Sequence, residues 1–382
     1  MEENNWVISM PYPPYVRVSA RVSVETSVLT GSGSIGNYNT HAIATVIFKR
    51  GTDPPKVYEV PVITGNAIKH WHALYLAETY EALGGKNLND LCRKGIGARG
   101  YNVKASIGGA KLQKAESEEE AIKDLCNDIH GFLNPEQQIK RDSLVKVSFG
   151  IPILEEEVLE VASKYSVTHN RVIPVKNVEE EMMVFKQEYS SILYGFSMSM
   201  NLGMTLIPMY SGGAVSGIGN IDNERRLRVK ASLLALLPLL QGSASKQARA
   251  LPISRVEELL IVLSKLPVPN IVHAAYPDYL ERSIELVKGY VLSVSTLSDK
   301  SKSDTNTWIL CYSRHHNRCD PRTLSQLPRD STTSKAEDKE TEEFTIDNLI
   351  KIKRYKDIGN MIKEAAEKAS DMVQPLESQK SA

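Results

Sequence analysis

Two stretches of alternating side chains constrain the fold of this chain more than any other feature. Within residues 190–206, an apolar residue occupies every second position from Ile192 to Leu202. Residues 16–29 show the same period of two, with Arg17 and Arg21 on the polar side. Because successive side chains of a strand point to opposite faces, both stretches predict long strands with one buried and one solvated face. Such alternation is typical of antiparallel sheets.

The remaining elements mix strands and helices. Further strands are predicted at residues 42–49, in the run that ends near residue 63, at 144–154 and at 289–295. Helices are predicted at residues 65–83, 117–129, 222–242, 254–265, 277–288 and 346–372. Residues 298–343 are rich in Ser, Thr, Asp and Lys and predict a flexible segment. Half-buried strands with crossing helices and long insertions predict an α+β fold built on a ferredoxin-like sheet.

A short motif separates the third predicted strand from the first helix. Thr64-Gly65-Asn66 interrupts an apolar run, and Lys69-His70 follows within the first two helical turns. Thr and Asn are ordinary capping residues, so the motif fits a capped helix start. A helix N-terminus also offers unpaired N–H donors and a positive dipole end, which suits a phosphate group. The motif alone leaves both interpretations open.

Several other motifs lack the context that their chemistry needs. Residues 31–36 fit Gly-x-Gly-x-x-Gly, but a β-forming run follows where dinucleotide binding requires a helix. The loop at residues 211–220 lacks the Gly-Lys-Ser/Thr ending of a P-loop. Four thiol or imidazole groups lie close together in the sequence: Cys311, His315, His316 and Cys319. Their spacing matches no common zinc ligand set. We therefore expect no cofactor, no metal and no catalytic residue.

The overall charge and the cysteine content narrow the class of protein further. Lys and Arg number 46, as do Asp and Glu, so any nucleic-acid surface has to be a local patch. Four cysteines in 382 residues do not make a disulfide framework and fit a reducing compartment. Prolines interrupt the N-terminal stretch, and no apolar run is long enough to span a bilayer. These features predict a cytoplasmic protein without membrane contact.

Six segments, each weak alone, resemble one known family in their order and spacing. They are Ile63-Thr64-Gly65-Asn66, Lys69-His70-Trp71-His72, His130-Gly131-Phe132, Thr168-His169-Asn170-Arg171-Val172, Glu188-Tyr189-Ser190-Ser191-Ile192-Leu193-Tyr194-Gly195-Phe196 and Lys246-Gln247-Ala248-Arg249-Ala250-Leu251-Pro252. Together they resemble the DevR-type backbone subunit of the archaeal type I-A CRISPR Cascade complex. The resemblance covers residues 16–290 and does not reach the N-terminal arm or most of the C-terminal segment.

The resemblance implies an architecture and a function. The architecture is an RRM-like palm at residues 16–297, with a helical finger at 85–143 and a β-hairpin thumb at 155–188. Residues 1–15 are then an N-terminal arm, and residues 298–382 a flexible linker with a C-terminal amphipathic helix. The implied function is that of a non-catalytic subunit that binds guide RNA (crRNA) and oligomerises into a helical backbone. It presents the guide for pairing with target DNA in antiviral defence. Other Cascade subunits are implied partners, including the one that caps the 5′ end of the guide.

The same resemblance implies a set of RNA-binding residues. The helix start and the first strand contribute Thr64, Gly65, Asn66, Lys69, His70, Arg17 and Arg21. The base of the thumb contributes His169, Asn170 and Arg171. The loop rich in glycine and serine contributes Lys246, Gln247 and Arg249. Met182 or Met183 is the expected wedge between bases where the thumb crosses the RNA.

Two other functions remain open at this point. Related backbone subunits of type III complexes cut target RNA from an acidic loop, so the chain could be a ribonuclease. No matching acidic residue stands in a loop that the sequence can place. The second alternative is a DNA-binding transcriptional regulator, although the chain shows no helix-turn-helix signature.

Overall fold

A long, mainly antiparallel sheet with helices on both faces forms the body of the protein. The computed structural model describes residues 12–108, 112–171, 183–211, 215–242, 253–297, 306–315, 318–319, 341–346 and 348–376. The strands are β1 (Tyr15–Ser27), β2 (Gly31–Ile35), β3 (Tyr38–His41), β4 (Ile43–Phe48), β5 (Lys56–Pro61), β6 (Phe132–Asn134), β7 (Ile139–Arg141), β8 (Val145–Val147), β9 (Ile151–Pro152), β10 (Lys164–Arg171), β11 (Met183–Asn201), β12 (Ile253–Ser264), β13 (Thr307–Ser313), β14 (Thr341–Ile346) and β15 (Ile350–Tyr355). The helices are α1 (Gly65–Ala82), α2 (Asp90–Arg93), α3 (Glu118–Ala121), α4 (Leu125–His130), α5 (Glu156–Val161), η1 (Leu202–Met204), α6 (Ile221–Leu234), α7 (Leu236–Gly242), α8 (Tyr279–Leu297) and α10 (Ile358–Asp371).

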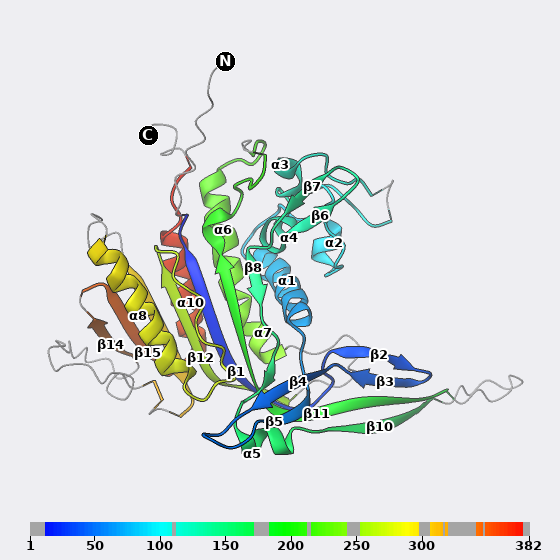
Figure 1. Ribbon diagram of the computed structural model, residues 1–382. Helices are drawn as coiled ribbons and strands as arrows, with labels where there is room; N and C mark the ends of the chain where they lie inside the picture. Colours follow the sequence, from blue (N-terminus) through cyan, green and yellow to red (C-terminus); the bar gives the residue numbers. More distant parts are fainter. Residues whose placement is uncertain are drawn as a thin grey trace, which may run out of the picture.

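The strand β1 lies in the middle of the sheet and pairs antiparallel with both β11 and β12 (Figure 1). The strand order is β14-β15-β13-β12-β1-β11-β3-β2, and β8, β9 and β10 also pair with β11. Hairpins β4–β5 and β6–β7 stand outside this sheet. The two alternating stretches of the sequence are therefore confirmed as long antiparallel strands, and they pair with each other.

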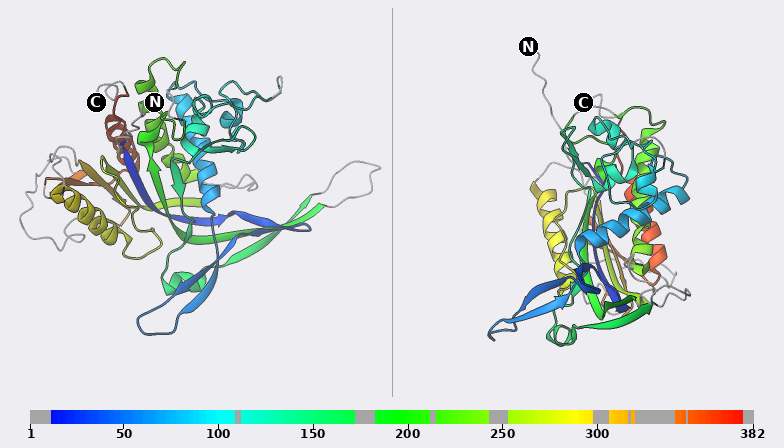
Figure 2. Two further views of the ribbon diagram at one scale, coloured as in Figure 1. Left: turned by 45° about the horizontal axis from the view of Figure 1, so that its top comes forward. Right: turned by 90° about the vertical axis from the view of Figure 1, so that its right-hand side faces the viewer.

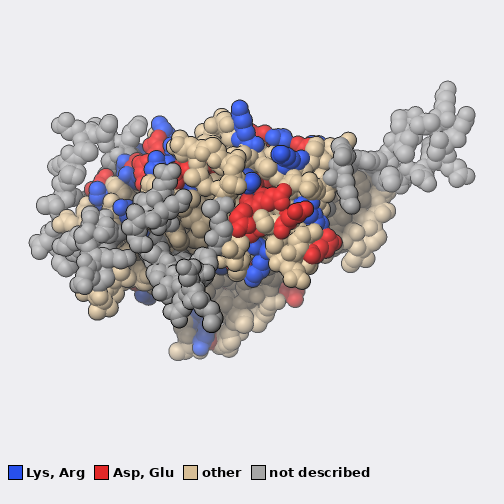
Figure 3. Space-filling model, turned by 90° about the horizontal axis from the view of Figure 1, so that it is seen from above, with Lys and Arg blue, Asp and Glu red and all other residues tan. Residues whose placement is uncertain are grey.

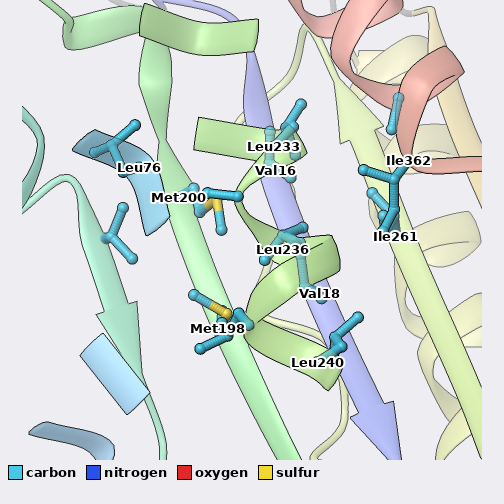
Figure 4. Close-up of a cluster of buried hydrophobic side chains, with 14 of the residues drawn as sticks. Val16, Val18, Leu76, Met198, Met200, Leu233, Leu236, Leu240, Ile261 and Ile362 are labelled. Atoms are coloured by element: carbon cyan, nitrogen blue, oxygen red, sulfur yellow. The ribbon is translucent and has the colours of Figure 1, made fainter. Parts of the chain in front are cut away.

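One face of the sheet packs against α1, α6, α7 and α10. Val16 and Val18 of β1 and Met200 of β11 lie on this face and are buried. Figure 4 shows them beside Leu233 of α6 and Leu236 of α7, and Ile362 of α10 lies over Ile261 of β12. Complete burial of such a side chain stabilises a fold by about 1.5–3 kcal/mol. Ile68 and Leu76 of α1 belong to the same apolar cluster, which anchors the helix whose start the sequence singled out.

The helix α8 covers the opposite face of the sheet. Figure 2 (right) shows this helix in yellow on one side of the strands and α10 in red on the other. Ile284 and Val287 of α8 pack with Leu260, Val262 and Ile309 of the sheet. The solvated face expected for β1 is therefore wrong: Arg17 and Arg21 are each only 6% exposed.

Several assignments in the C-terminal part are wrong. The strand β12, predicted as a helix at residues 254–265, is buried between β1 and β13. A strand buried on both faces has a continuous apolar run, and periodicity cannot distinguish this run from a buried helix. Residues 289–295 continue α8 instead of forming a strand. Within the segment predicted to be flexible, β13 pairs with β12 and β15.

Short helices and a hairpin from residues 90–141, here called the annex, lie beside α1 and α6 (Figure 1). One carboxylate joins the annex to the body. Asp128 of α4 lies 2.6 Å from the guanidinium group of Arg141 and 2.9 Å from that of Arg228 in α6. Glu118 and Glu224 complete the network at 3.3 Å from Arg141 and 2.8 Å from Arg228. Each buried charge therefore has an opposite partner, as burial requires.

All four cysteines form disulfides, which corrects the expectation that they make no disulfide framework. Cys92 of α2 bonds to Cys126 of α4 inside the annex, and Cys311 of β13 bonds to Cys319. The cysteine count could not reveal this pairing, because only the fold brings the Cα atoms to 5.7 and 6.0 Å. Oxidised Cys311 and Cys319 are not thiolate ligands, and His316 lies outside the described residues.

The described part of the chain lacks two features that would point to other functions. It contains no group of three or more His, Cys, Asp or Glu side chains arranged to hold a metal ion. None of its helices combines the length and the apolar character needed to cross a membrane.

The network around Asp128 generates a stability prediction. Asp128→Asn should lower the free energy of unfolding by about 3–5 kcal/mol, because two buried guanidinium groups lose their shared counter-charge. Asp278→Asn is the matched control, since its ion pair with Arg282 is exposed and should change stability little. Denaturant unfolding of the two variants measures the difference. Equal midpoints would contradict the role assigned to Asp128.

Candidate nucleic-acid interface

The start of α1 and the hairpin β2–β3 face each other across a groove of about 760 Å³. The end of β1 and the residues that follow it complete the groove. Three residues predicted to bind RNA line it together, namely Thr64, Asn66 and His70. The groove is therefore the place where the helix motif of the sequence meets another segment of the chain.

Thr64 is the N-cap of α1, as one interpretation of the motif predicted. Its side-chain oxygen accepts a hydrogen bond from the N–H of Ala67 at 3.3 Å. Its own N–H donates to the hydroxyl of Thr30 at 3.0 Å, which ties the helix start to the segment between β1 and β2. The other N–H groups of a first helical turn have no partner within the helix. Asn66 is exposed beside them.

Gly65 is buried and has a steric role. A Cβ atom at this position would lie 2.5 Å from the carbonyl oxygen of Val147 and 2.9 Å from that of Ser148. Only glycine lets the helix start approach the β8 backbone this closely. Gly65 therefore positions the groove wall from behind, which differs from the contact expected for it.

The opposite wall of the groove is the glycine-rich run at residues 31–36, which lacks the helix that a dinucleotide-binding motif requires. Residues 31–35 form β2, which ends the strand order and pairs with β3 and with no other strand of the described residues. An edge strand leaves a row of backbone N–H and C=O groups without partners. All five residues of β2 are exposed. Four of them line the groove, namely Gly31, Ser32, Gly33 and Ser34. The wall therefore presents backbone groups with little side-chain cover.

Glu188 of β11 holds this hairpin in place. Its carboxylate accepts hydrogen bonds from the hydroxyl of Tyr38 and the N–H of His41, both at 2.6 Å, and from Lys164 at 2.9 Å. Burial raises the pKa of Glu188, but the hydrogen bonds from His41 and Lys164 outweigh it and leave the pKa lowered. The ionised carboxylate thus fixes β3 against the long strand.

The consecutive residues Lys69 and His70 face different surroundings. His70 lines the groove with Trp71, whose ring lies 5.6 Å away. Lys69 instead lines a second pocket formed with the annex. The structure therefore brings Thr64, Asn66 and His70 together and separates Lys69 from them.

Arg17 and Arg21 lie inside the protein, so the surface expected for them is absent. The Arg17 guanidinium donates to the carbonyl oxygen of Val268 at 2.9 Å. That of Arg21 donates to the carbonyl oxygen of Ala274 at 2.8 Å and lies 3.3 Å from Glu258. Carbonyl groups of the segment before α8 replace water on this face of β1.

The β-hairpin expected within residues 155–188 is present. The strand β10 pairs with the first part of β11 and extends away from the body of the protein (Figures 1 and 2). The ring of His169 stacks on Phe185 at 5.1 Å, and Tyr165 stacks on Tyr189 at 5.9 Å. Asn170 and Arg171 end β10, and Met183 begins β11. Met182, Lys246, Gln247 and Arg249 lie outside the described residues.

Sequence reasoning missed the aromatic rings on one face of this hairpin. They stand four residues apart on each of two paired strands, Tyr165 and His169 on β10 and Phe185 and Tyr189 on β11. That spacing was visible in the sequence, but the pairing register that brings the rings together was not.

Gly65 generates a test of the groove. Gly65→Ala should destabilise the protein by about 1–3 kcal/mol, because the added carbon forces α1 away from β8. Gly289→Ala in α8 is the control: a Cβ there meets no atom within 4 Å. That change should stabilise the helix by about 0.5–1 kcal/mol. Unfolding measurements on both variants should therefore move in opposite directions, and a neutral Gly65→Ala would refute the close approach.

Buried neutral histidines predict a loss of stability in acid. Burial lowers the pKa of His41 and of His72 to about 4, below the unfolded value of about 6.5. The unfolded chain then takes up protons first, so their contribution is complete above pH 6.5 and is lost as the pH falls towards 4. Asp124, whose pKa burial raises to about 6, acts in the opposite sense.

Thermal unfolding at pH 7.5 and 5.5 measures this effect. The midpoint should fall at the lower pH, and it should fall less in His41→Gln, whose amide oxygen can still accept the N–H of Leu29. A midpoint that rises on acidification would show that Asp124 outweighs the histidines.

Comparison with known proteins places the chain in a family. The profile described as CRISPR-associated negative auto-regulator DevR/Csa2 matches residues 18–284. "CRISPR-associated protein Cas7/Cst2/DevR" of Thermoproteus tenax is 55% identical over 292 residues, which are 74% of this chain and 84% of that protein. "CRISPR-associated aCascade subunit Cas7/Csa2 2" of Saccharolobus solfataricus is 28% identical over 287 residues, 70% of this chain and 84% of that protein.

One chain of a solved structure titled "CRISPR RNA-guided surveillance complex, pre-nicking" aligns with this chain at a TM-score of 0.41 and 12% sequence identity. The alignment covers 93% of this chain and 100% of that chain. The length of the profile match and the identity to the Thermoproteus tenax relative establish the family: the chain belongs to the CRISPR-associated DevR/Csa2 family.

Proposed function

We propose that this chain is a non-catalytic subunit that binds guide RNA and assembles with further copies into the helical backbone of a type I-A CRISPR surveillance complex. The observation that carries the proposal is the groove between the edge strand β2 and the capped start of α1. The relative in Saccharolobus solfataricus, named as an aCascade subunit, supports the assembly.

The groove suits the backbone of a nucleic acid better than its bases. Backbone N–H groups of an edge strand and of a helix N-terminus are donors for phosphate oxygens. Small Ser and Gly side chains on β2 let a phosphate approach those donors closely. Contacts of this kind carry no sequence information, and a guide RNA needs none from the protein because base pairing reads the target.

The charge at one end of the molecule is mixed. Figure 3 looks down on the end of the molecule that carries α3 and shows carboxylates gathered in the middle, with Lys and Arg side chains around them. A broad basic surface is absent from this view. The described residues that line the groove include no Lys or Arg, so binding there would rely on backbone and hydroxyl donors and on His70.

The projecting hairpin β10–β11 adds a second element to the proposal. Stacked rings such as Tyr165 with Tyr189 offer platforms for bases of any sequence. We assign the sheet core to the RRM-like palm, the annex to the finger and this hairpin to the thumb. The guide would then present its bases to target DNA, and other subunits, one of them at the 5′ end of the guide, would complete the assembly.

The ribonuclease alternative gains no support from His72 and His130, two histidines that contact each other. His72 and His130 lie 3.0 Å apart through their ring nitrogens, but they are 0% and 2% exposed. A general acid or base has to reach its substrate, and these rings cannot.

A charge placed in the groove wall tests the proposal. Ser34→Glu adds a carboxylate beside the proposed path of the phosphates and should weaken binding of a labelled single-stranded RNA at least about tenfold at 0.1 M salt. Ser293→Glu on α8 is the matched control and should bind as the wild type does. Fluorescence anisotropy at several salt concentrations measures both. Equal affinities of the two variants would remove the groove from the RNA site.

A further inference from the structure

A second pocket beside α1, here called the annex pocket, gathers three cations from separate parts of the chain. It measures about 600 Å³ and is lined by Lys69 of α1, Arg99 of the annex and Lys140 of β7. The groove described above is lined by other residues of the same helix start, among them Asn66 and His70. The first two turns of α1 therefore contribute to two neighbouring openings.

None of the three cations, Lys69, Arg99 and Lys140, forms a direct ion pair with a carboxylate of the described residues. Arg99 donates one hydrogen bond to the carbonyl oxygen of His130 at 2.9 Å, and Lys140 lies 4.4 Å from the ring centre of Tyr210. The one carboxylate in the lining, Asp142, accepts the hydroxyl of Tyr210 at 2.8 Å. Arg141 also lines the pocket, but its charge is neutralised by Asp128 inside the annex. The lining thus keeps an excess of positive charge.

Burial makes this excess costly. Lys69 is half-buried, and burial together with the neighbouring Arg99 lowers its pKa to about 8. Burial also lowers the pKa of Arg99 to about 10, although Asp124 opposes the shift. Two like charges in a partly desolvated site destabilise each other, and an anion bound between them would relieve both.

The guanidinium of Arg99 is held by a rigid support. The carbonyl oxygen of Ser232 can only accept, so Nε2 of His72 at 2.9 Å has to donate to it. Nδ1 of His72 then accepts a hydrogen bond from the Nε2–H of His130, so the His72 ring is neutral. Burial lowers the pKa of His130, which keeps that ring neutral as well. Gly131, at φ +70, leaves no room for a Cβ atom, which would lie 2.5 Å from the carbonyl oxygen of Arg141. The carbonyl group that holds Arg99 is therefore locked in place.

We propose that Lys69, Arg99 and Lys140 form a binding site for a phosphate group of a nucleic-acid backbone, next to the phosphates held in the groove. A planar guanidinium with free donors binds phosphate in a fork, and a lysine ammonium adds a point charge. The site rests on the proposed binding of guide RNA, and it assigns Arg99 and Lys140 to the same strand. At the start of α1, a phosphate would then meet the cation Lys69 in the annex pocket, and another phosphate would meet backbone N–H groups in the groove.

Substitution of Arg99 tests the annex pocket in the full-length protein. Arg99→Gln should weaken binding of a labelled single-stranded RNA by about ten- to a hundredfold. It should also reduce the slope of log affinity against log salt by about 0.7, the value for one lost phosphate contact. Arg93→Gln is the matched control, because Arg93 lies on α2 of the same annex but is already paired with Glu81 and Asp90. Arg99→Lys should recover part of the affinity.

A measurement on the wild type separates this proposal from the groove. Lys69 is labelled with an amine-acylating reagent at pH 8, with and without inorganic pyrophosphate, and its modification is read by mass spectrometry. Pyrophosphate should protect Lys69 even if the protein proves not to bind RNA, which would refute only the proposed function. If Lys69 is not protected, and Arg99→Gln behaves like Arg93→Gln, the annex pocket is not a phosphate site. A different result would overturn the proposal: Arg99→Gln fails to self-associate in the absence of RNA, while the salt dependence of RNA binding stays unchanged. Arg99 would then pair with a carboxylate of a second copy of the chain.

Discussion

The carboxylate of Asp128 holds two buried guanidinium groups, and the position of the annex depends on this contact. Arg141 comes from β7 and Arg228 from α6, and the N–H of Leu206 also donates to the same carboxylate at 3.1 Å. Buried ion pairs add little net stability, but removal of one partner is severe, so such networks select one arrangement over others. Lys140 is the neighbour of Arg141 on β7. The network therefore sets where one wall of the annex pocket stands relative to α1.

The sequence predicted the centre of the sheet and failed at its surroundings. Alternation identified β1 and β11 because one face of each packs against helices in a regular period of two. The same pattern does not show whether a polar side chain of a strand faces solvent or carbonyl groups of the protein. Arg21 meets the carbonyl of Ala274, which lies far along the chain, so its polar position indicated the character of its partner and not exposure. The strand β12 was predicted as a helix for a different reason. It is buried on both faces, so apolar residues do not alternate with polar ones along it.

The candidate site was predictable on one side only. The cap at Thr64 follows from local residue chemistry, which is visible in a few consecutive positions. The facing wall is a glycine-rich run whose role depends on the parallel pairing of β3 with β11 near Lys186. No local pattern encodes that pairing. No helix follows this run, so it is not a dinucleotide-binding motif. It forms a wall of the groove because a distant segment, β11, holds it opposite α1.

The division between Lys69 and His70 follows from helix geometry. Consecutive residues of an α-helix point about 100° apart, so the start of α1 can serve two openings without a bend in the chain. If both openings hold phosphates of one strand, main-chain donors carry one contact and cations carry the other. Neutral donors bind phosphate without adding fixed positive charge, so the chain can hold a polyanion while its formal net charge stays at zero. The salt dependence of binding then reports mainly the annex pocket, because counterion release scales with the phosphates that cations neutralise.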